Sequence, residues 1–189
     1  MRVLVAGVIG GIVLFIWGAV AHMALPIGEM GMKVATNQDA ALAAVSASAT
    51  PGAGVYMLPG MSPEEWSNED TRKAFAEKAK ASPYAFVIYQ PDGNPVNVSM
   101  GPSLVKQFVG DTLVALLVAW LMSLAPFAFG RRVLIGTVVG VASWLAISVP
   151  YWNWYMFPTD FTLGTLLDVG LGLLIASVPM AWWLGRGRP

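Results

Sequence analysis

FVGDTLVALLVAWLMSLAPFAFGRRVLIGTVVGVASWLAISVP, the stretch from Phe108 to Pro150, decides the fold of this chain. Two apolar runs flank the pair Arg131-Arg132, and each is long enough to cross about 30 Å of hydrocarbon as a helix. We predict two transmembrane helices here, over residues 108–129 and 133–150. The second should end at Pro150, because proline has no backbone N–H. The link is so short that the two helices must be antiparallel neighbours.

Two further apolar segments of similar length lie toward the ends of the chain, and we predict transmembrane helices over residues 1–24 and 161–184. Hydrophobic residues make up 56% of the 189 residues and charged residues only 12%. The mean hydropathy is +0.62, which is typical of a membrane protein. We therefore predict a membrane all-α fold, a four-transmembrane-helix bundle. A small α+β domain would be inserted between the first two helices, over residues 25–107.

The arginines indicate the orientation of the bundle, because short cytoplasmic loops retain Lys and Arg. Basic residues lie before the first span, between the second and third, and after the fourth: Arg2, Arg131, Arg132, Arg186 and Arg188. The loop predicted over residues 151–160 has none. We predict that both termini are cytoplasmic and that residues 25–107 are extracytoplasmic. The loop would place an aromatic belt at headgroup level, formed by Tyr151, Trp152, Trp154 and Tyr155.

In its general sequence features the chain resembles bacterial inner-membrane proteins. We predict a multi-pass protein of that membrane in contact with its lipid bilayer. An alternative interpretation of residues 1–21 is a cleaved signal peptide. Arg2, the apolar run and the small residues Ala19-Val20-Ala21 imitate its three regions. Against this, the apolar run is long for a signal peptide, and Trp17 lies close to the cleavage point.

The segment between the first two spans holds most of the charged residues and has signals for short helices and strands. An Ala-rich helix should begin at Asn37 or Asp39 and end at Pro51-Gly52. The spacing of Ser62 and Glu65 predicts a capping box at the start of a second helical stretch, which Ser67-Asn68 should interrupt. GVYMLPG, residues 54–60, predicts a strand. Residues 84–89 and 96–100 predict a hairpin that turns at Asp92-Gly93.

Composition excludes several classes of function. The absence of cysteine excludes disulfides, iron–sulfur clusters and thiolate metal sites. A single histidine, His22, excludes a multi-histidine metal site within one chain. Eleven basic and eleven acidic residues balance, so we expect no nucleic-acid partner. No catalytic motif is present, and we predict no catalytic residue, no bound metal and no cofactor.

Asp168 is the candidate functional residue inside the membrane. It lies seven positions into the fourth span, where the charged form of a carboxylate is disfavoured. We expect it to be protonated or reached by water, with Ser143 and Trp17 at similar depth as hydrogen-bond donors. It could bind a proton or a cation. The alternative, which we favour, is a neutral acid that is hydrogen-bonded across helices for stability.

A second polar set lies at the predicted outer ends of the four spans: His22, Glu29, Asp111, Asn153 and Asp160. These side chains could converge as a proton relay or a divalent-cation site. They could instead be polar only because helix ends meet water and headgroups there. Asp160 has a sufficient structural role as the residue that precedes the fourth helix.

Two weaker patterns have structural alternatives. Met23, Met30 and Met32 follow His22 and could form a copper site, although Met also fills gaps in apolar cores. Small residues recur in the third and fourth spans: Gly136, Gly140, Gly164, Gly172 and Ala176. We interpret them as contacts between helices of one chain, with the seam of a homo-oligomer as the alternative.

Three hypotheses about function follow. The first is a non-enzymatic accessory, assembly or sensing component that binds a protein partner through its extracytoplasmic domain. The second is a small proton- or cation-coupled transporter that uses Asp168, which would need an oligomer because four spans make a thin wall. The third is a membrane enzyme that acts on a lipid or quinone near the aromatic loop.

Overall fold

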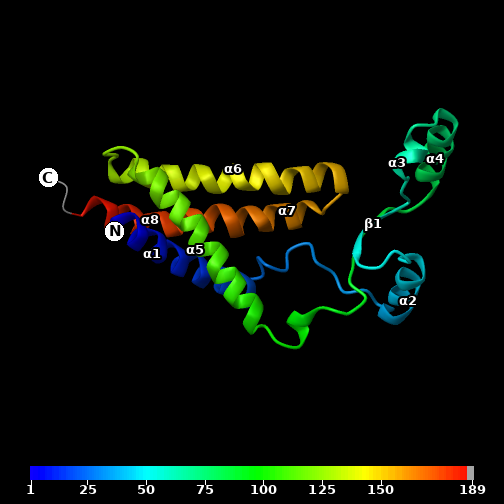
Figure 1. Ribbon diagram of the computed structural model, residues 1–189, viewed down its shortest axis with the longest axis horizontal. Coiled ribbons are helices and arrows are strands. Elements are labelled where there is room, and N and C mark those ends of the chain that lie inside the picture. The colour runs from blue at the N-terminus through cyan, green and yellow to red at the C-terminus, as the bar shows by residue number, and fades with distance from the viewer. Residues whose placement is uncertain (187–189) are drawn as a thin grey trace. The chain divides into compact units, whose positions relative to one another are not determined.

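The computed structural model describes residues 1–186 (Figure 1), so Arg188, which contributes to the predicted orientation, lies outside the described residues. The chain forms two compact units. We call the first the membrane unit; it contains Met1–Lys33 and the chain from Ser99 onward. We call the second the inserted unit; it contains Val34–Val98.

Four long apolar helices form the membrane unit. Helix α1 (Arg2–Ala19) continues as a π-helical turn over Val20–Ala24. Helices α5 (Gly101–Ser123) and α6 (Phe129–Tyr155) follow the inserted unit. The last span is α7 (Thr159–Thr165), a π-helical turn (Leu166–Leu171) and α8 (Gly172–Gly185). All four are long and apolar enough to cross a bilayer, which confirms the prediction of a helical membrane protein with four spans.

The bounds of the middle helices differ from the predicted ones. Helix α5 begins at Gly101 and ends at Ser123, a few residues before Pro126, which disfavours a helical conformation in the residue before it. Helix α6 passes through Pro150 and ends where Met156 adopts a left-handed conformation with φ of 57°. The prediction that Pro150 ends this helix is therefore wrong. Spanning helices tolerate an internal proline because neighbouring groups bond the carbonyl that it leaves free.

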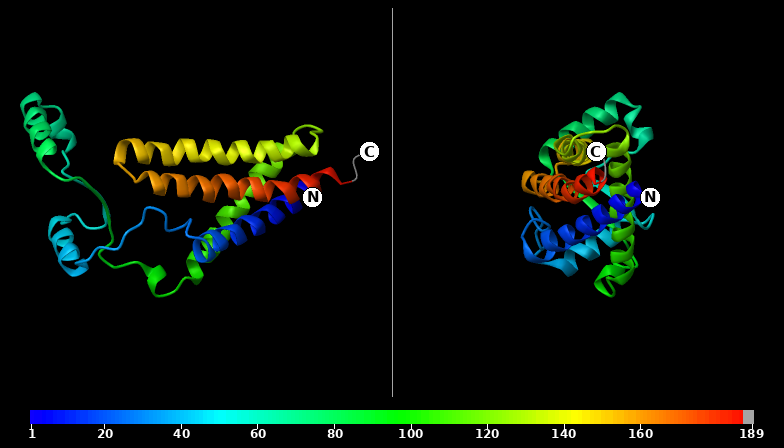
Figure 2. Two further views of the ribbon diagram at one scale, coloured as in Figure 1. Left: turned by 180° about the vertical axis from the view of Figure 1, so that it is seen from behind. Right: turned by 90° about the vertical axis from the view of Figure 1, so that its left-hand side faces the viewer.

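Helix α1 packs against α5 and α8, and α6 packs against α7 and α8. Although only a short turn joins α5 to α6, α5 runs obliquely to α6, and its main neighbour is α1 (Figures 1 and 2). The predicted pairing of these consecutive helices therefore holds over a short stretch only.

The spanning helices of the membrane unit have two ends, to which we give names. We call the end with Arg2, Arg131, Arg132 and Arg186 the arginine end, and the other the aromatic end.

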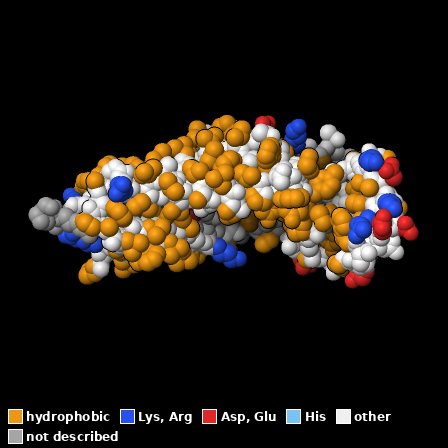
Figure 3. Space-filling model, turned by 90° about the horizontal axis from the view of Figure 1, so that it is seen from above, with side chains coloured by type: hydrophobic (Ala, Val, Ile, Leu, Met, Phe, Trp, Pro, Cys, Tyr) orange, Lys and Arg blue, Asp and Glu red, His pale blue; other side chains and the backbone are white. Residues whose placement is uncertain are grey.

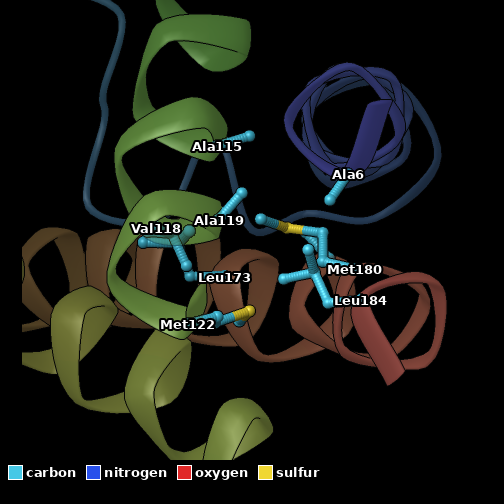
Figure 4. Close-up of a cluster of buried hydrophobic side chains, with 9 residues drawn as sticks. Ala6, Ala115, Val118, Ala119, Met122, Leu173, Met180 and Leu184 are labelled. Atoms are coloured by element: carbon cyan, nitrogen blue, oxygen red, sulfur yellow. The ribbon is translucent and has the colours of Figure 1, made fainter. Parts of the chain in front are cut away.

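The core of the membrane unit lies where α1, α5 and α8 meet (Figure 4). Its buried residues are small or flexible: Ala6, Ala115, Val118, Ala119, Met122, Leu173, Ala176, Met180 and Leu184. Small side chains let helices approach closely, which is how helices associate in lipid. Large apolar side chains cover the outer surface of these helices (Figure 3). This apolar exterior suits contact with a lipid bilayer.

The predicted glycine contacts hold α6 against the last span. A Cβ on Gly136 would collide with the Ser177 hydroxyl of α8. A Cβ on Gly140 would lie 3.1 Å from Leu173 Cβ and 3.2 Å from Gly170 Cα. The prediction that these glycines serve contacts within one chain is confirmed, because the two backbones come too close for larger side chains.

The inserted unit consists of short helices and strands. They are α2 (Gln38–Ser48), β1 (Gly54–Leu58), α3 (Pro63–Trp66), α4 (Glu69–Ala81), β2 (Ala85–Tyr89) and a 3₁₀ turn (Pro95–Asn97). The predicted caps are confirmed: Asn37 caps α2, and Ser62 with Glu65 forms a capping box. Hydrogen bonds from its own backbone N–H and from Ser62 hold the pKa of Glu64 below its usual range. Asn68 caps α4 and separates it from α3.

The predicted hairpin is wrong. Strand β2 pairs antiparallel with β1, with Val55 opposite Ile88, and not with the residues that follow it. Pro95 lacks an N–H, and the Asn94 side chain accepts a hydrogen bond from the Val96 N–H, so the chain there forms a 3₁₀ turn. Of the predicted domain, residues 25–107, the inserted unit contains Val34–Val98, and residues 25–33 and 99–107 lie in the membrane unit.

Candidate functional site

The structure brings together two residues that the sequence placed in separate sets. His22 Nε2 lies 3.4 Å from Asp168 Oδ2. The two side chains are 54% and 33% exposed, so neither is sealed inside the bundle. His22 is the single histidine of the chain and Asp168 is the one carboxylate of the last span beyond its first turn. We take this pair as the candidate functional site.

Both residues lie in π-helical turns. His22 belongs to the turn Val20–Ala24, in which the Leu25 N–H donates to the Val20 carbonyl at 2.9 Å. Asp168 belongs to the turn Leu166–Leu171. A π-helical turn adds one residue to a helix, changes the direction of the side chains within it, and occurs frequently at functional sites. Two such turns therefore set the directions of the paired side chains.

Trp17 also contacts Asp168, as expected, but through a different atom. Its Nε1 donates to the backbone carbonyl of Asp168 at 2.9 Å, not to the carboxylate. The indole fits closely, since a Cβ on Gly172 would lie 2.7 Å from Trp17 Cδ1. Ser143, the other expected donor, instead donates to the Val139 carbonyl of its own helix at 2.8 Å. Trp17 thus fixes the backbone of the Asp168 turn and leaves the carboxylate to His22.

The loop after α1 holds His22 in place. The Gly28 N–H donates to the Ala21 carbonyl at 3.1 Å, and a Cβ on Gly28 would collide with the His22 ring. Gly31 has φ of 76°, which favours glycine, and a Cβ there would lie 2.7 Å from the Phe161 backbone nitrogen. The loop therefore depends on two glycines to pass close to His22 and to the start of the last span.

Asp111 is the third ionisable group near the pair. Gln107 Nε2 donates to Asp111 Oδ1 at 2.8 Å, and Asp111 lies within electrostatic range of Asp168. Asp111 thus adds a second carboxyl group to the surroundings of the pair.

The rest of the predicted outer set lies apart from this pair. Within residues 1–186, no side-chain hydrogen bond or ion pair joins Glu29, Asn153 or Asp160 to it. Asp160 lies in the first turn of α7, where a negative charge is favourable. Over the same residues, no three His, Cys, Asp or Glu side chains form a group that could hold a metal ion.

Two residues of the predicted aromatic belt, Tyr151 and Trp152, contact residues that follow α6. Tyr151 packs on Tyr155 and on Phe157, with ring centroids 5.5 and 5.2 Å apart, and Phe157 packs on Phe161 at 5.2 Å. Trp152 Nε1 donates to Thr159 Oγ1 at 3.2 Å. Tyr151, Trp152, Trp154 and Tyr155 lie in the last turns of α6 and not in a loop over residues 151–160 as predicted.

Sequence reasoning missed a set of hydrogen bonds between α6 and the last span. Trp144 Nε1 donates to the Thr162 carbonyl at 2.8 Å, and Thr165 Oγ1 donates to Ser148 Oγ at 3.0 Å. The available signal was a hydroxyl residue in each helix, Ser148 in α6 and Thr165 in α7. These bonds fix the segment that carries Asp168.

Chemically, the pair combines an imidazole, whose ring nitrogens can donate or accept a proton, with a carboxylate, whose oxygens can bind a proton or a cation. No protein-family model, no curated protein and no solved structure matches the chain. Its function must therefore be inferred from its own residues.

Proposed function

We propose that the chain is a non-enzymatic accessory, assembly or sensing component of a bacterial inner membrane. In this proposal the arginine end faces the cytoplasm, and the inserted unit lies outside it and binds a partner protein. One observation carries the proposal: within Val34–Val98, Ala49 is the single buried residue. A unit that buries so little apolar surface gains little stability from its own core.

The two-stranded sheet gives this unit an apolar surface. Residues that oppose each other across the strands share a face, so Val55, Met57 and Ile88 lie on one face of the sheet. We call these three residues the apolar sheet face. Val55, Met57 and Ile88 are 60%, 48% and 70% exposed.

The opposite face of the sheet has a neighbour within the unit. Tyr56 and Tyr89 pack edge to face with ring centroids 6.5 Å apart, and the Tyr89 hydroxyl donates to Ser46 Oγ of α2 at 3.0 Å. Helix α2 thus contacts one face, whereas the apolar sheet face is the one that a partner can cover.

The charge of the inserted unit favours a protein over a membrane surface as the occupant. The sequence from Val34 to Val98 has seven acidic and four basic residues, and anionic lipids repel a net negative unit. A two-stranded sheet is marginal by itself and offers unpaired edge groups. A partner protein can supply both an apolar surface and a strand to pair with.

The test compares Ile88→Asp on the apolar sheet face with Ala76→Asp on exposed α4. A photoreactive residue at position 57 would be cross-linked in native membranes before purification of the full chain. We expect one defined protein adduct, reduced at least about fivefold by Ile88→Asp and unchanged by Ala76→Asp, because a buried charge costs several kcal/mol at an apolar interface. Adducts with lipid or with a second copy only, or equal yields from both variants, would contradict the proposal.

A proton- or cation-coupled transporter is the second candidate, favoured by the contact of His22 with Asp168. Its test is proton flux, measured with a pH-sensitive dye in proteoliposomes that contain Asp168→Asn or the control Asp160→Asn. Transport predicts flux that Asp168→Asn abolishes and Asp160→Asn preserves. An unchanged flux in a folded Asp168→Asn protein would reject it.

A further inference from the structure

Ionisable side chains divide the spans of the membrane unit into two halves. His22, Asp111 and Asp168 lie in the half toward the aromatic end. Between these residues and the arginine end, the spans contain no Asp, Glu, His, Lys or Arg. The sequence has none over residues 3–21, 112–130, 133–159 or 169–185. The candidate site therefore has charged neighbours on one side only.

The pair lies closer to the aromatic end than to the arginine end. His22 is in the last turn of the first span, which ends at Ala24, whereas about 30 Å of helix separates it from Arg2 at a rise of 1.5 Å per residue. By the same rise, about 25 Å of helix separates Asp168 from Gly185 at the end of α8. Both side chains of the pair are partly exposed. Water at the aromatic end can therefore reach them.

Close packing of α1, α5 and α8 fills the arginine half. Ala115 and Met180 are fully buried where these three helices meet (Figure 4). A Cβ on Gly10 would collide with Met180 Sδ, and a Cβ on Gly7 would lie 2.9 Å from the Leu116 Cα. Apolar packing of this kind leaves few voids that could hold water.

The contact of α6 with α8 is closed in the same half. Ser177 of α8 is fully buried, and its hydroxyl donates to the Leu173 carbonyl of its own helix at 2.6 Å. Gly136 of α6 lies directly against this hydroxyl. The hydroxyl is therefore bonded within α8 and enclosed by α6, so it offers no step for a solute between the helices.

We propose that His22 and Asp168 form a one-sided site, which hydrophilic solutes reach from the aromatic end and which the packed arginine half separates from the other side. A proton or small cation that binds the pair then leaves toward the side from which it came. This arrangement deepens the sensing role within the proposed function, because the pair samples the solution on the side of the inserted unit. It requires no partner of that unit, so either proposal can fail alone.

A small, permanently charged methanethiosulfonate reagent tests access from each side, because the chain has no cysteine of its own. The full chain would carry His22→Cys, Asp168→Cys or Ser177→Cys, and would be treated in membrane vesicles of both orientations. Two exposed positions, Ala74→Cys in the inserted unit and Gly130→Cys at the arginine end, identify the side that the reagent reaches. Since these markers define the sides, the result does not depend on which side faces the cytoplasm.

We expect His22→Cys and Asp168→Cys to react at least about tenfold faster from the side of Ala74→Cys than from the side of Gly130→Cys, because the reactive thiolate is suppressed in apolar surroundings. Ser177→Cys is the matched control, since a thiol replaces a hydroxyl of similar shape, and it should stay unreactive from both sides. Asp168→Cys preserves the test if His22→Cys does not fold.

Three results would overturn the proposal. The first is a reaction of the two site variants that is equally fast from both sides, or faster from the side of Gly130→Cys. The second is no reaction of folded His22→Cys and Asp168→Cys from either side. The third is a reaction of Ser177→Cys from the arginine end. Proton flux through the unaltered protein in proteoliposomes would also contradict a closed arginine half.

Discussion

Two tryptophans differ in whether their indole N–H is hydrogen-bonded. Trp17 Nε1 donates to the Asp168 carbonyl at 2.9 Å, whereas Trp183 Nε1 is buried and has no hydrogen-bond partner within residues 1–186. A hydrogen bond contributes about 1 kcal/mol net, and a buried polar group without a partner costs about 1–3 kcal/mol. The same residue type therefore affects stability in opposite directions at two positions.

Replacement of each by phenylalanine tests this difference. Trp17→Phe removes a donor from a partly buried turn and should lower the free energy of unfolding by about 1 kcal/mol more than Trp183→Phe does. Both changes remove a similar volume, so the comparison cancels the packing loss. Unfolding in detergent, followed by circular dichroism, measures the difference. A larger loss in Trp183→Phe would show that the assigned Trp17 bond is not the stabilising one.

The sequence identifies the members of the candidate site but not their contact. Asp168 is conspicuous as a carboxylate inside an apolar span, and His22 as a single histidine. Their contact depends on two π-helical turns, and no residue spacing predicts such turns. Depth counted at the regular helical rise therefore placed His22 and Asp168 at different levels.

At the scale of elements, close approach of α6 to the last span depends on glycine. Gly140 faces Leu173, Gly170 and the Val169 carbonyl within 3.2 Å of where a Cβ would lie. Gly110 of α5 has nothing within 4 Å of the same position. Glycine is thus required by packing at Gly140, whereas at Gly110 it only weakens the helix.

Alanine at these two positions should have opposite effects. Gly140→Ala should lower the free energy of unfolding by about 1–3 kcal/mol because α6 and the last span must separate. Gly110→Ala should raise it by about 0.5–1 kcal/mol because alanine favours the helix. Thermal unfolding in one detergent measures both. Equal stabilisation by the two substitutions would contradict the assigned contact of α6 with the last span.

Elements were predictable where the signal was local. The caps at Asn37 and Ser62 follow from residues within one helical turn, and the four spans follow from their length and hydropathy. The partner of β2 was not predictable, because β1 lies about thirty residues away in sequence and a nearer Asp92-Gly93 turn favoured a hairpin. Pro150 was misread because the rule that proline ends a helix is weaker in spans.

At the scale of the whole molecule, the account depends on which side of the membrane each part occupies. Arg131 and Arg132 lie at the turn between α5 and α6, and the inserted unit joins α1 to α5 at their other ends. The proposed orientation places that turn in the cytoplasm because short cytoplasmic loops retain arginine. The proposed partner of the inserted unit must then lie outside the cytoplasm.

Cysteine labelling tests this orientation most directly, because the chain has no cysteine of its own. Ala74→Cys on exposed α4 and Gly130→Cys beside the arginine pair would each be treated with a membrane-impermeant maleimide in spheroplasts. The account predicts that Ala74→Cys reacts in intact spheroplasts and that Gly130→Cys reacts only after lysis. Reaction of Gly130→Cys in intact spheroplasts, with Ala74→Cys protected until lysis, would contradict it.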